Sequence, residues 1–151
     1  MRSFLLSVSI MSLVSCVGSP EGVEPVRNFE LTRYLGTWYE LARLDHRFER
    51  GLTNVSATYQ KRSDGGIDVV NRGYDAAKGK WKEATGRAYF VNGSDVGSLK
   101  VTFFWPFYGG YNVVWLDAEY QYAIVSGPNN KYIRFLSRRA EADDPIADEV
   151  V

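Results

Sequence analysis

The sequence predicts an all-β protein in which eight strands form one antiparallel, up-and-down barrel. Apolar and polar residues alternate with period two through most of the chain, and turn-forming residues separate the runs at short intervals. Aromatic residues make up 15% of the chain, which suits a half-buried pleated sheet. No segment before Ala140 shows a helical period. Short, evenly spaced strands of this kind form a barrel or a sandwich, and we expect the barrel.

The predicted strands follow one another with short connections. At 151 residues the chain is long enough for one domain with a sizeable core. Gly, Asn, Asp, Ser and Pro cluster in the connections 63–66, 92–95, 108–110 and 127–130, as turns require. The eight predicted strands cover residues 36–44, 53–62, 67–74, 80–91, 98–105, 111–117, 121–126 and 131–138.

Strict alternation assigns one face of each strand to the interior of the barrel. The fourth strand contributes small residues to that face, Ala84, Gly86 and Ala88, which leave room inside. An eight-stranded barrel holds either packed side chains or one small ligand, so both a cavity and a solid core are compatible with the pattern. The other predicted inward residues include Val55, Ala57, Tyr59, Ile67, Val69, Asn71, Leu99, Val101, Phe103, Tyr111, Val113, Trp115, Tyr132, Arg134 and Leu136.

The N-terminus is typical of an exported protein. A short positive start at Arg2 precedes an apolar stretch, 4–14, that is too short to span a bilayer. We therefore interpret residues 1–15 as a signal peptide. Cys16 is the only cysteine, which excludes an internal disulfide. Residues 16–27 are rich in Gly and Pro and are expected to form a flexible tether before a barrel over 28–139.

Charge and composition exclude several classes of function. Lys and Arg number 18 and Asp and Glu number 18, so nothing favours nucleic acid as a partner. His46 is the only histidine, and metal sites usually need clustered His or Cys. No Gly-x-Ser-x-Gly nucleophile motif occurs. We therefore predict no catalytic residues, no metal and no cofactor.

A glycine and a tryptophan open the first strand, in Gly36-Thr37-Trp38, and an arginine ends the last, in Leu136-Ser137-Arg138. Parity places both at one end of the barrel, where Arg138 can lie over the indole of Trp38 as a cation–π pair. Together with segments 33–40, 45–51, 65–69 and 106–113, this order of motifs resembles the lipocalins, above all the bacterial outer-membrane and apolipoprotein D-like members. The resemblance covers about residues 28–138 and implies that Gly36, Trp38 and Arg138 close the barrel.

The resemblance also implies a membrane anchor and a ligand. Leu13-Val14-Ser15-Cys16 then matches a lipoprotein signal, so Cys16 would be acylated. Because Val17 is not Asp, the expected location is the outer membrane, facing the periplasm. The implied function is to carry or store a fatty acid, lysophospholipid or related lipid. The alternative is a lipocalin-fold enzyme acting on a lipid or isoprenoid.

Seven residues are predicted to line the ligand pocket. The apolipoprotein D-like pocket suggests Tyr59, Asn71, Phe103 and Tyr111, which alternation also points inward, and alternation adds Val113 and Trp115. Arg134 stands where relatives tend to have a tryptophan. A charge facing a cavity is unfavourable unless paired, so we hypothesise that Arg134 binds a ligand carboxylate or phosphate. The alternative is a register shifted by one residue, which would place Arg134 in solvent.

Two further features bear on partners. Aromatic residues at the predicted open end, Phe48, Trp105, Phe107 and Tyr108, could cover the opening as a lid, or contact a membrane or a second copy of the chain. Residues 140–151 are expected to be the start of a truncated C-terminal helix. A short helix leaves part of the outer wall uncovered, which predicts lower stability and self-association, and a homodimer would be one form of it.

Overall fold

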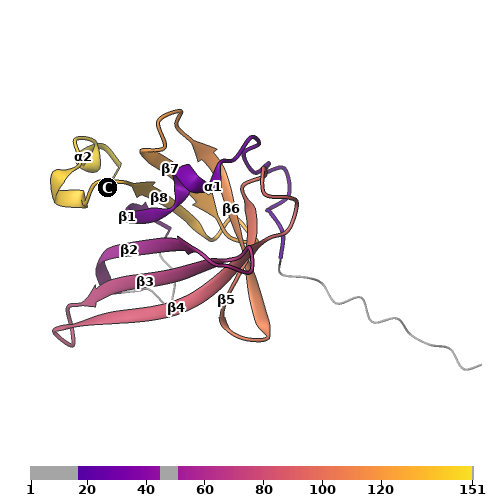
Figure 1. Ribbon diagram of the computed structural model, residues 1–151. Coiled ribbons are helices and arrows are strands. Elements are labelled where there is room, and N and C mark those ends of the chain that lie inside the picture. Colours follow the sequence, from indigo (N-terminus) through magenta and orange to yellow (C-terminus); the bar gives the residue numbers. More distant parts are fainter. Residues whose placement is uncertain (1–16, 45–50, 151) are drawn as a thin grey trace, which may run out of the picture.

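The computed structural model describes residues 17–44 and 51–150, and these form a closed barrel of eight antiparallel strands in sequence order. Each strand pairs with the next along the chain, and β1 also pairs with β8, which leaves no free edge (Figure 1). The predicted fold class is confirmed. The strands are β1 Gly36–Arg43, β2 Leu52–Lys61, β3 Ile67–Asp75, β4 Lys80–Phe90, β5 Ser98–Phe104, β6 Phe107–Leu116, β7 Tyr122–Ser126 and β8 Ile133–Ser137.

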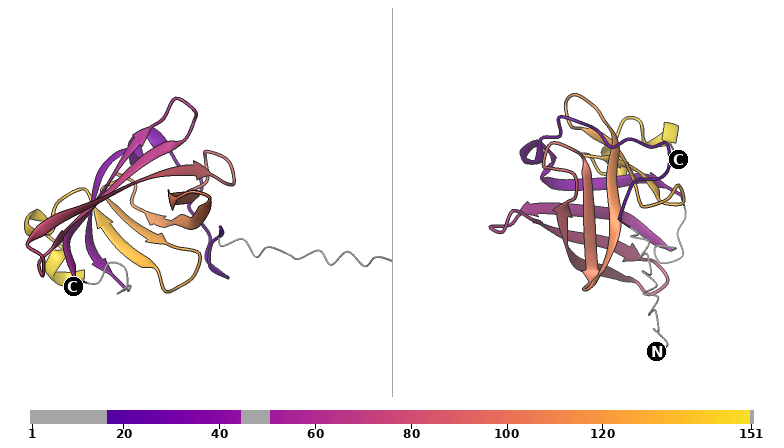
Figure 2. Two further views of the ribbon diagram at one scale, coloured as in Figure 1. Left: turned by 90° about the horizontal axis from the view of Figure 1, so that it is seen from below. Right: turned by 90° about the vertical axis from the view of Figure 1, so that its right-hand side faces the viewer.

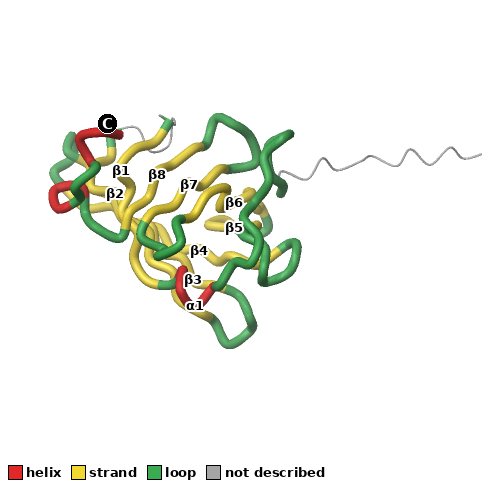
Figure 3. The backbone as a smooth tube through the Cα atoms, turned by 90° about the horizontal axis from the view of Figure 1, so that it is seen from above, coloured by secondary structure: helices red, strands yellow, loops and turns green. Residues whose placement is uncertain are grey.

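The two ends of the barrel differ. One end, called the base here, carries the β2–β3, β4–β5 and β6–β7 connections and the short helix α1, Leu31–Tyr34. The opposite end, called the mouth, carries the β3–β4, β5–β6 and β7–β8 connections. The strands wrap around a common axis between these ends (Figure 2), and very little of the described chain is helical (Figure 3). No helix in the described ranges has the length and apolar character needed to cross a membrane.

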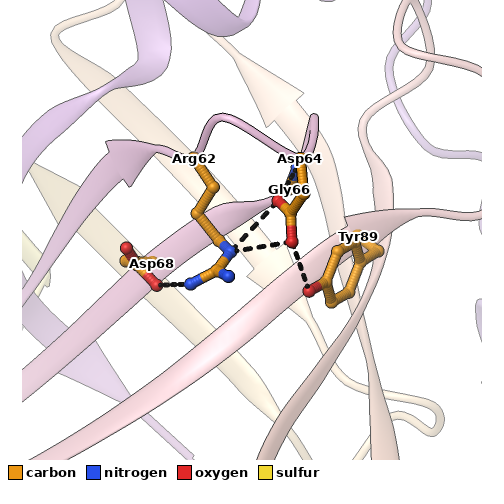
Figure 4. Close-up of polar contacts among 5 residues, drawn as sticks. All are labelled: Arg62, Asp64, Gly66, Asp68 and Tyr89. Atoms are coloured by element: carbon orange, nitrogen blue, oxygen red, sulfur yellow. Dashed lines mark hydrogen bonds and ion pairs between the residues drawn. The ribbon is translucent and has the colours of Figure 1, made fainter.

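Polar side chains fix the β2–β3 turn at the base (Figure 4). Asp64 accepts a hydrogen bond from the backbone N–H of Gly66 at 2.9 Å, and the hydroxyl of Tyr89 donates to the same carboxylate at 3.2 Å. Arg62 bridges Asp64 and Asp68, with its Nη1 2.6 Å from Asp68 Oδ1. The backbone bond from Gly66, with help from Arg62 and Tyr89 against a partial desolvation, lowers the pKa of Asp64. Asp64 is therefore ionised at neutral pH and keeps its hydrogen bonds within the turn.

Two local features differ from the expectation because they are invisible to period-two alternation. Helix α1 has only four residues and so shows no helical period. The predicted turn at 108–110 is wrong: β6 begins at Phe107, and Gly109 and Gly110 pair with Val101 and Lys100 of β5. The chain reverses instead at Trp105–Pro106, between the end of β5 and the start of β6.

A β-bulge corrects the predicted orientation of Trp115. In the β6–β7 ladder Val113 pairs with Val125, but Trp115 pairs with Ile124, so one extra residue of β6 is inserted. The bulge reverses the faces beyond it. Trp115 lies on the outer wall with 45% of its surface exposed, whereas Leu116 packs against the core.

The N-terminal strap, residues 17–27, lies against the outer wall rather than away from it (Figure 1). Val26 and Gly97 are joined by a backbone bond of 2.9 Å, and Val26 N–H donates to Val113 O at 2.8 Å. Farther along, the side-chain amide of the fully buried Asn112 donates to Gly18 O at 2.9 Å. These contacts differ from the flexible tether expected for 16–27, because Asn112 and Gly97 supply partners that sequence order does not reveal.

The C-terminal segment is short and is held by one carboxylate. It contains a 3-10 turn, Glu141–Asp143, and helix α2, Ala147–Val150, which lies outside the barrel beside β1. Asp144 accepts hydrogen bonds from Ser137 Oγ of β8, from Tyr122 OH at 3.3 Å and from Ile146 N–H at 3.0 Å. Phe135 of the outer wall stacks on Tyr122 at 5.9 Å between ring centres.

Candidate functional site

The base of the barrel is closed by an arginine over a tryptophan. Trp38 is fully buried, and its indole N–H donates to Tyr34 O of α1 at 2.8 Å. The guanidinium carbon of Arg138 lies 3.9 Å from the centre of the Trp38 ring, in the expected cation–π arrangement. Its nitrogens donate to three carbonyl oxygens, those of Arg33, Thr37 and Tyr120. Arg138 thus joins α1, β1 and the β6–β7 connection.

Gly36 allows this closure. Its φ is +95°, a conformation that side chains with a Cβ rarely adopt, and a Cβ there would lie 3.4 Å from Arg138 Nη1. The turn from α1 into β1 therefore needs glycine. The three residues predicted to close the barrel, Gly36, Trp38 and Arg138, lie together at the base.

Above this closure the barrel contains a cavity of about 940 Å³ that extends to the mouth. It lies near the upper end of the size range of small-molecule sites. Most of its wall is apolar, and Arg134 is the only charged side chain lining it among the described residues. The apolar lining comprises Phe29, Leu31, Ile67, Val69, Ala84, Ala88, Leu99, Val101, Phe103, Phe104, Phe107 and Val125.

Gly86 sets the shape of one wall. A Cβ at this position would lie 2.6 Å from Thr102 O and 2.8 Å from the Phe103 ring. The missing side chain allows the Phe103 ring to approach β4 closely, and Ala84 and Ala88 of the same strand also line the cavity. The Phe103 ring therefore fills part of the space left by the small residues of β4, and the rest of that space belongs to the cavity.

Three tyrosines form a hydrogen-bonded chain deep in the cavity. The hydroxyl of Tyr111 lies 2.7 Å from that of Tyr34 and accepts from that of Tyr59 at 2.8 Å. Burial raises the pKa of all three hydroxyls well above the ordinary value. The group therefore stays protonated and neutral, and it presents polar oxygens to any ligand that reaches the base.

Arg134 faces the cavity and is paired with a buried carboxylate. Its Nε lies 3.5 Å from Glu40 Oε2, while Arg43 Nη1 lies 2.5 Å from Glu40 Oε1. The Glu40 side chain is 4% exposed, compared with 22% for that of Arg134. A bulge in β1 between Glu40 and Ala42 accompanies this arrangement. A charge buried this deeply needs such pairing.

The structure brings most of the predicted pocket residues together. Tyr59, Asn71, Phe103, Tyr111 and Arg134 all line the cavity. Val113 points inward but is fully buried in the core near Gly97, and Trp115 lies outside because of the bulge. Neither of these two belongs to the lining.

Alternation did not identify several lining residues. Tyr34 and Phe29 precede the first strand, so no strand pattern could place them, although Tyr34 directly precedes the Gly36 motif. Tyr132 lies on the predicted inward face and lines the cavity, although alternation did not identify it as a pocket residue. Cys16, His46 and Phe48 lie outside the described residues. Within the described ranges no cluster of His, Cys, Asp or Glu is suited to hold a metal ion.

The chain is similar in sequence to several known lipoproteins and lipocalins. The chain is 57% identical to the outer membrane lipoprotein Blc of Vibrio cholerae over 152 residues, covering 100% of this chain and 89% of that protein. It is 52% identical to the outer membrane lipoprotein Blc of Escherichia coli strain K12 over 132 residues, covering 87% and 75%. Bovine apolipoprotein D is more distant, with 33% identity over 78 residues, covering 52% of this chain and 40% of that protein.

Solved structures show the same fold. Insecticyanin from the tobacco hornworm Manduca sexta has a TM-score of 0.65 at 21% identity and covers 81% of this chain and 70% of its own. The profile of the lipocalin-like domain family matches residues 29–151, which includes every strand of the barrel. The chain belongs to the lipocalin-like domain family.

Proposed function

We propose that this protein is an outer-membrane lipoprotein of the cell envelope that binds a single-chain lipid in its barrel and carries or stores it. The observation that supports this most strongly is the apolar cavity of about 940 Å³, open at the mouth and polar near the base. The close relatives are named outer membrane lipoproteins, which supports a lipid anchor on Cys16 and a position facing the periplasm. A fatty acid and a lysophospholipid both combine one apolar chain with one polar head.

The polar groups that line the cavity favour a ligand with an anionic head. Arg134, Tyr59 and Tyr111 line the same cavity, so the cation and the tyrosine hydroxyls are all available to a polar ligand head. Glu40 forms ion pairs with two arginines, Arg43 and Arg134, so it keeps one partner if Arg134 turns toward a ligand. A ligand carboxylate would share Arg134 with Glu40, and its tail would fill the apolar wall toward Phe103.

Paired ligands test this role. A fatty acid and the alcohol of equal chain length differ only in the head, so their affinities isolate the contribution of the charge. Hydrogen bonds to charged groups are worth about 1.5–3 kcal/mol, so Arg134→Gln should weaken the acid by about tenfold or more and leave the alcohol nearly unchanged. Arg72→Gln is the matched control, because Arg72 lies on the outer face over the Trp81 ring.

Each negative result of these binding experiments would contradict a different part of the proposal. Equal losses for acid and alcohol would contradict the head-group role of Arg134 but not lipid binding. Absence of any saturable lipid binding, with no lipid in native mass spectra, would contradict the carrier itself. Conversion of the bound lipid into another compound would favour the alternative, an enzyme acting on a lipid or isoprenoid.

A further inference from the structure

The β5–β6 hairpin exposes large aromatic side chains at the mouth. Phe104, Trp105 and Phe107 are 82%, 80% and 78% exposed, more than any other large apolar residue of the described chain. Phe104 and Phe107 also line the cavity opening, whereas Trp105 does not. Exposed apolar clusters of this kind mark an interaction surface.

The charges of the described connections differ between the two ends. At the mouth, the β3–β4 and β7–β8 connections contribute the exposed Lys78 and Lys131, with the exposed Lys80 next to the first, and no carboxylate. Asp75, which flanks the β3–β4 connection, is paired with Lys82 at 2.7 Å. At the base the strand connections carry Asp64, Asp95, Asp117, Glu119 and Arg62, and the same end also carries the cations Lys61, Arg33, Arg138 and Arg139, so charges of both signs are present there.

We propose that the mouth of the barrel docks onto an anionic lipid bilayer, with the β5–β6 hairpin inserted at the interface. Trp is favoured at the level of lipid head groups, and lysines near such a surface are attracted to anionic lipids. The exposed aromatic residues and the exposed lysines lie at the same end, which would orient the barrel with its mouth toward the membrane. A lipid could then enter the cavity without crossing water, a consequence that depends on the proposed carrier function.

The strap follows the outer wall from Val26, near the base, to Gly18, which is closer to the mouth. Asn112 Nδ2 donates to both Gly18 O, at 2.9 Å, and Gly127 O, at 3.3 Å. Gly127 begins the β7–β8 connection at the mouth, and Cys16 precedes Gly18 by two residues. The described part of the strap therefore reaches, at Gly18, the neighbourhood of the β7–β8 connection at the mouth.

A second copy of the chain fits this surface less well. A symmetric mouth-to-mouth dimer would bring the same patch of both copies together, because a two-fold interface is self-complementary. Lys78, Lys80 and Lys131 would then face a partner of the same charge. A bilayer of anionic lipids instead supplies the opposite charge together with an apolar layer.

Vesicle binding of the chain from residue 16 onward, with Cys16→Ser so that it carries neither the signal peptide nor an acyl group, tests the proposal. Vesicles of phosphatidylethanolamine with phosphatidylglycerol are compared with vesicles of phosphatidylcholine by flotation. We expect binding to the anionic vesicles and little to the neutral ones. Trp105→Ala should lower the affinity about tenfold, and Lys78→Glu with Lys131→Glu should lower it by at least as much, with loss of its salt dependence. Depth-dependent quenching by brominated lipids should report Trp105 at the interface.

Matched controls give these variants their meaning. Trp115→Ala removes an exposed tryptophan from the outer wall away from the mouth, and Lys61→Glu reverses a lysine at the base. Neither should change vesicle binding. Trp105→Ala should also keep fatty-acid affinity in solution, since Trp105 lies outside the cavity lining, so a failed carrier function and a failed docking surface give different results.

Two outcomes would overturn the docking surface. One is equal vesicle binding by wild type, mouth variants and controls, or no binding at all. The other is a change from dimer to monomer on Trp105→Ala, seen by light scattering, without any change in vesicle binding; this would assign the hairpin to a contact between copies.

Discussion

The guanidinium of Arg138 stacks 3.9 Å above the ring of Trp38 although 100 residues separate them in the sequence. The pair joins the end of the last strand to the start of the first, where β8 and β1 close the barrel. It therefore links barrel closure to the floor of the ligand cavity.

Replacing Arg138 should destabilise the protein. Arg138→Ala removes the cation–π contact and the donors to three carbonyl oxygens, and we expect a loss of about 2–3 kcal/mol in the free energy of unfolding. Arg138→Lys keeps a cation but not the fork of donors and should lose about half as much. Urea unfolding measures both. The neighbouring exposed Arg139→Ala serves as control, and a similar loss there would refute the specific role of Arg138.

Adding one methyl group at Gly86 should reduce the ligand cavity. The Cβ of Gly86→Ala would lie 2.6 Å from Thr102 O and 2.8 Å from the Phe103 ring, so the backbone of β5 must shift and the ring must move into the cavity. We expect weaker binding of long-chain ligands and about 1–3 kcal/mol less stability. Gly18→Ala is the control, because nothing lies within 4 Å of a Cβ at that position and Gly18 does not line the cavity. Unchanged affinity for every chain length in Gly86→Ala would contradict this view of the wall.

The buried tyrosines predict a loss of stability at alkaline pH. Burial raises the pKa of Tyr34, Tyr59 and Tyr111 in the folded protein, whereas the unfolded chain titrates near the ordinary value of about 10. Above that pH the unfolded state binds fewer protons than the folded state, so the free energy of unfolding falls as pH rises. The stability contribution is complete below pH 10 and decreases as pH rises toward the folded pKa values.

Tyr111→Phe tests this linkage. Removing the central hydroxyl leaves Tyr34 and Tyr59 without their shared partner and should cost about 1–3 kcal/mol at neutral pH. The variant also has one titrating group fewer, so the slope of stability against pH above 10 should be smaller than in wild type. Denaturant unfolding from pH 8 to 11.5 measures both effects. An identical slope in the two proteins would show that Tyr111 ionises normally in the fold.

Asn112 should hold the N-terminal strap in place. Asn112→Ala removes the donor to Gly18 O and the acceptor of the Ser98 hydroxyl, both in buried surroundings. We expect faster hydrogen exchange at the Val26 and Gly97 amides and faster proteolysis within 17–27. Ser126→Ala is the control, since the Ser126 hydroxyl donates to the adjacent Gly127 O and not to the strap. Unchanged protection in Asn112→Ala would show that the backbone bonds alone hold the strap.

The repeating pattern of the chain was sufficient for eight strands and most of the lining, whereas it was compatible with both a barrel and a sandwich. In an unbroken strand successive side chains must point to opposite faces, so Tyr59, Asn71, Phe103 and Tyr111 could be assigned to one face from neighbours alone. The same parity placed Trp38 and Arg138 at one end. These are local rules, and they hold wherever the strand is regular.

Tertiary structure decided what depends on contacts between distant segments. The bulge after Val113 moved Trp115 to the outer wall, because its extra residue is accommodated by the partner strand and leaves no mark in the alternation. Glu40 became the buried partner of Arg134 only once β1 and β8 were paired. The strap contacts the wall because Gly97 and Asn112, some 70 and 94 residues further along than their partners, supply the hydrogen bonds. Sequence order constrains neighbours in a strand, whereas these contacts exist only after the sheet has closed on itself.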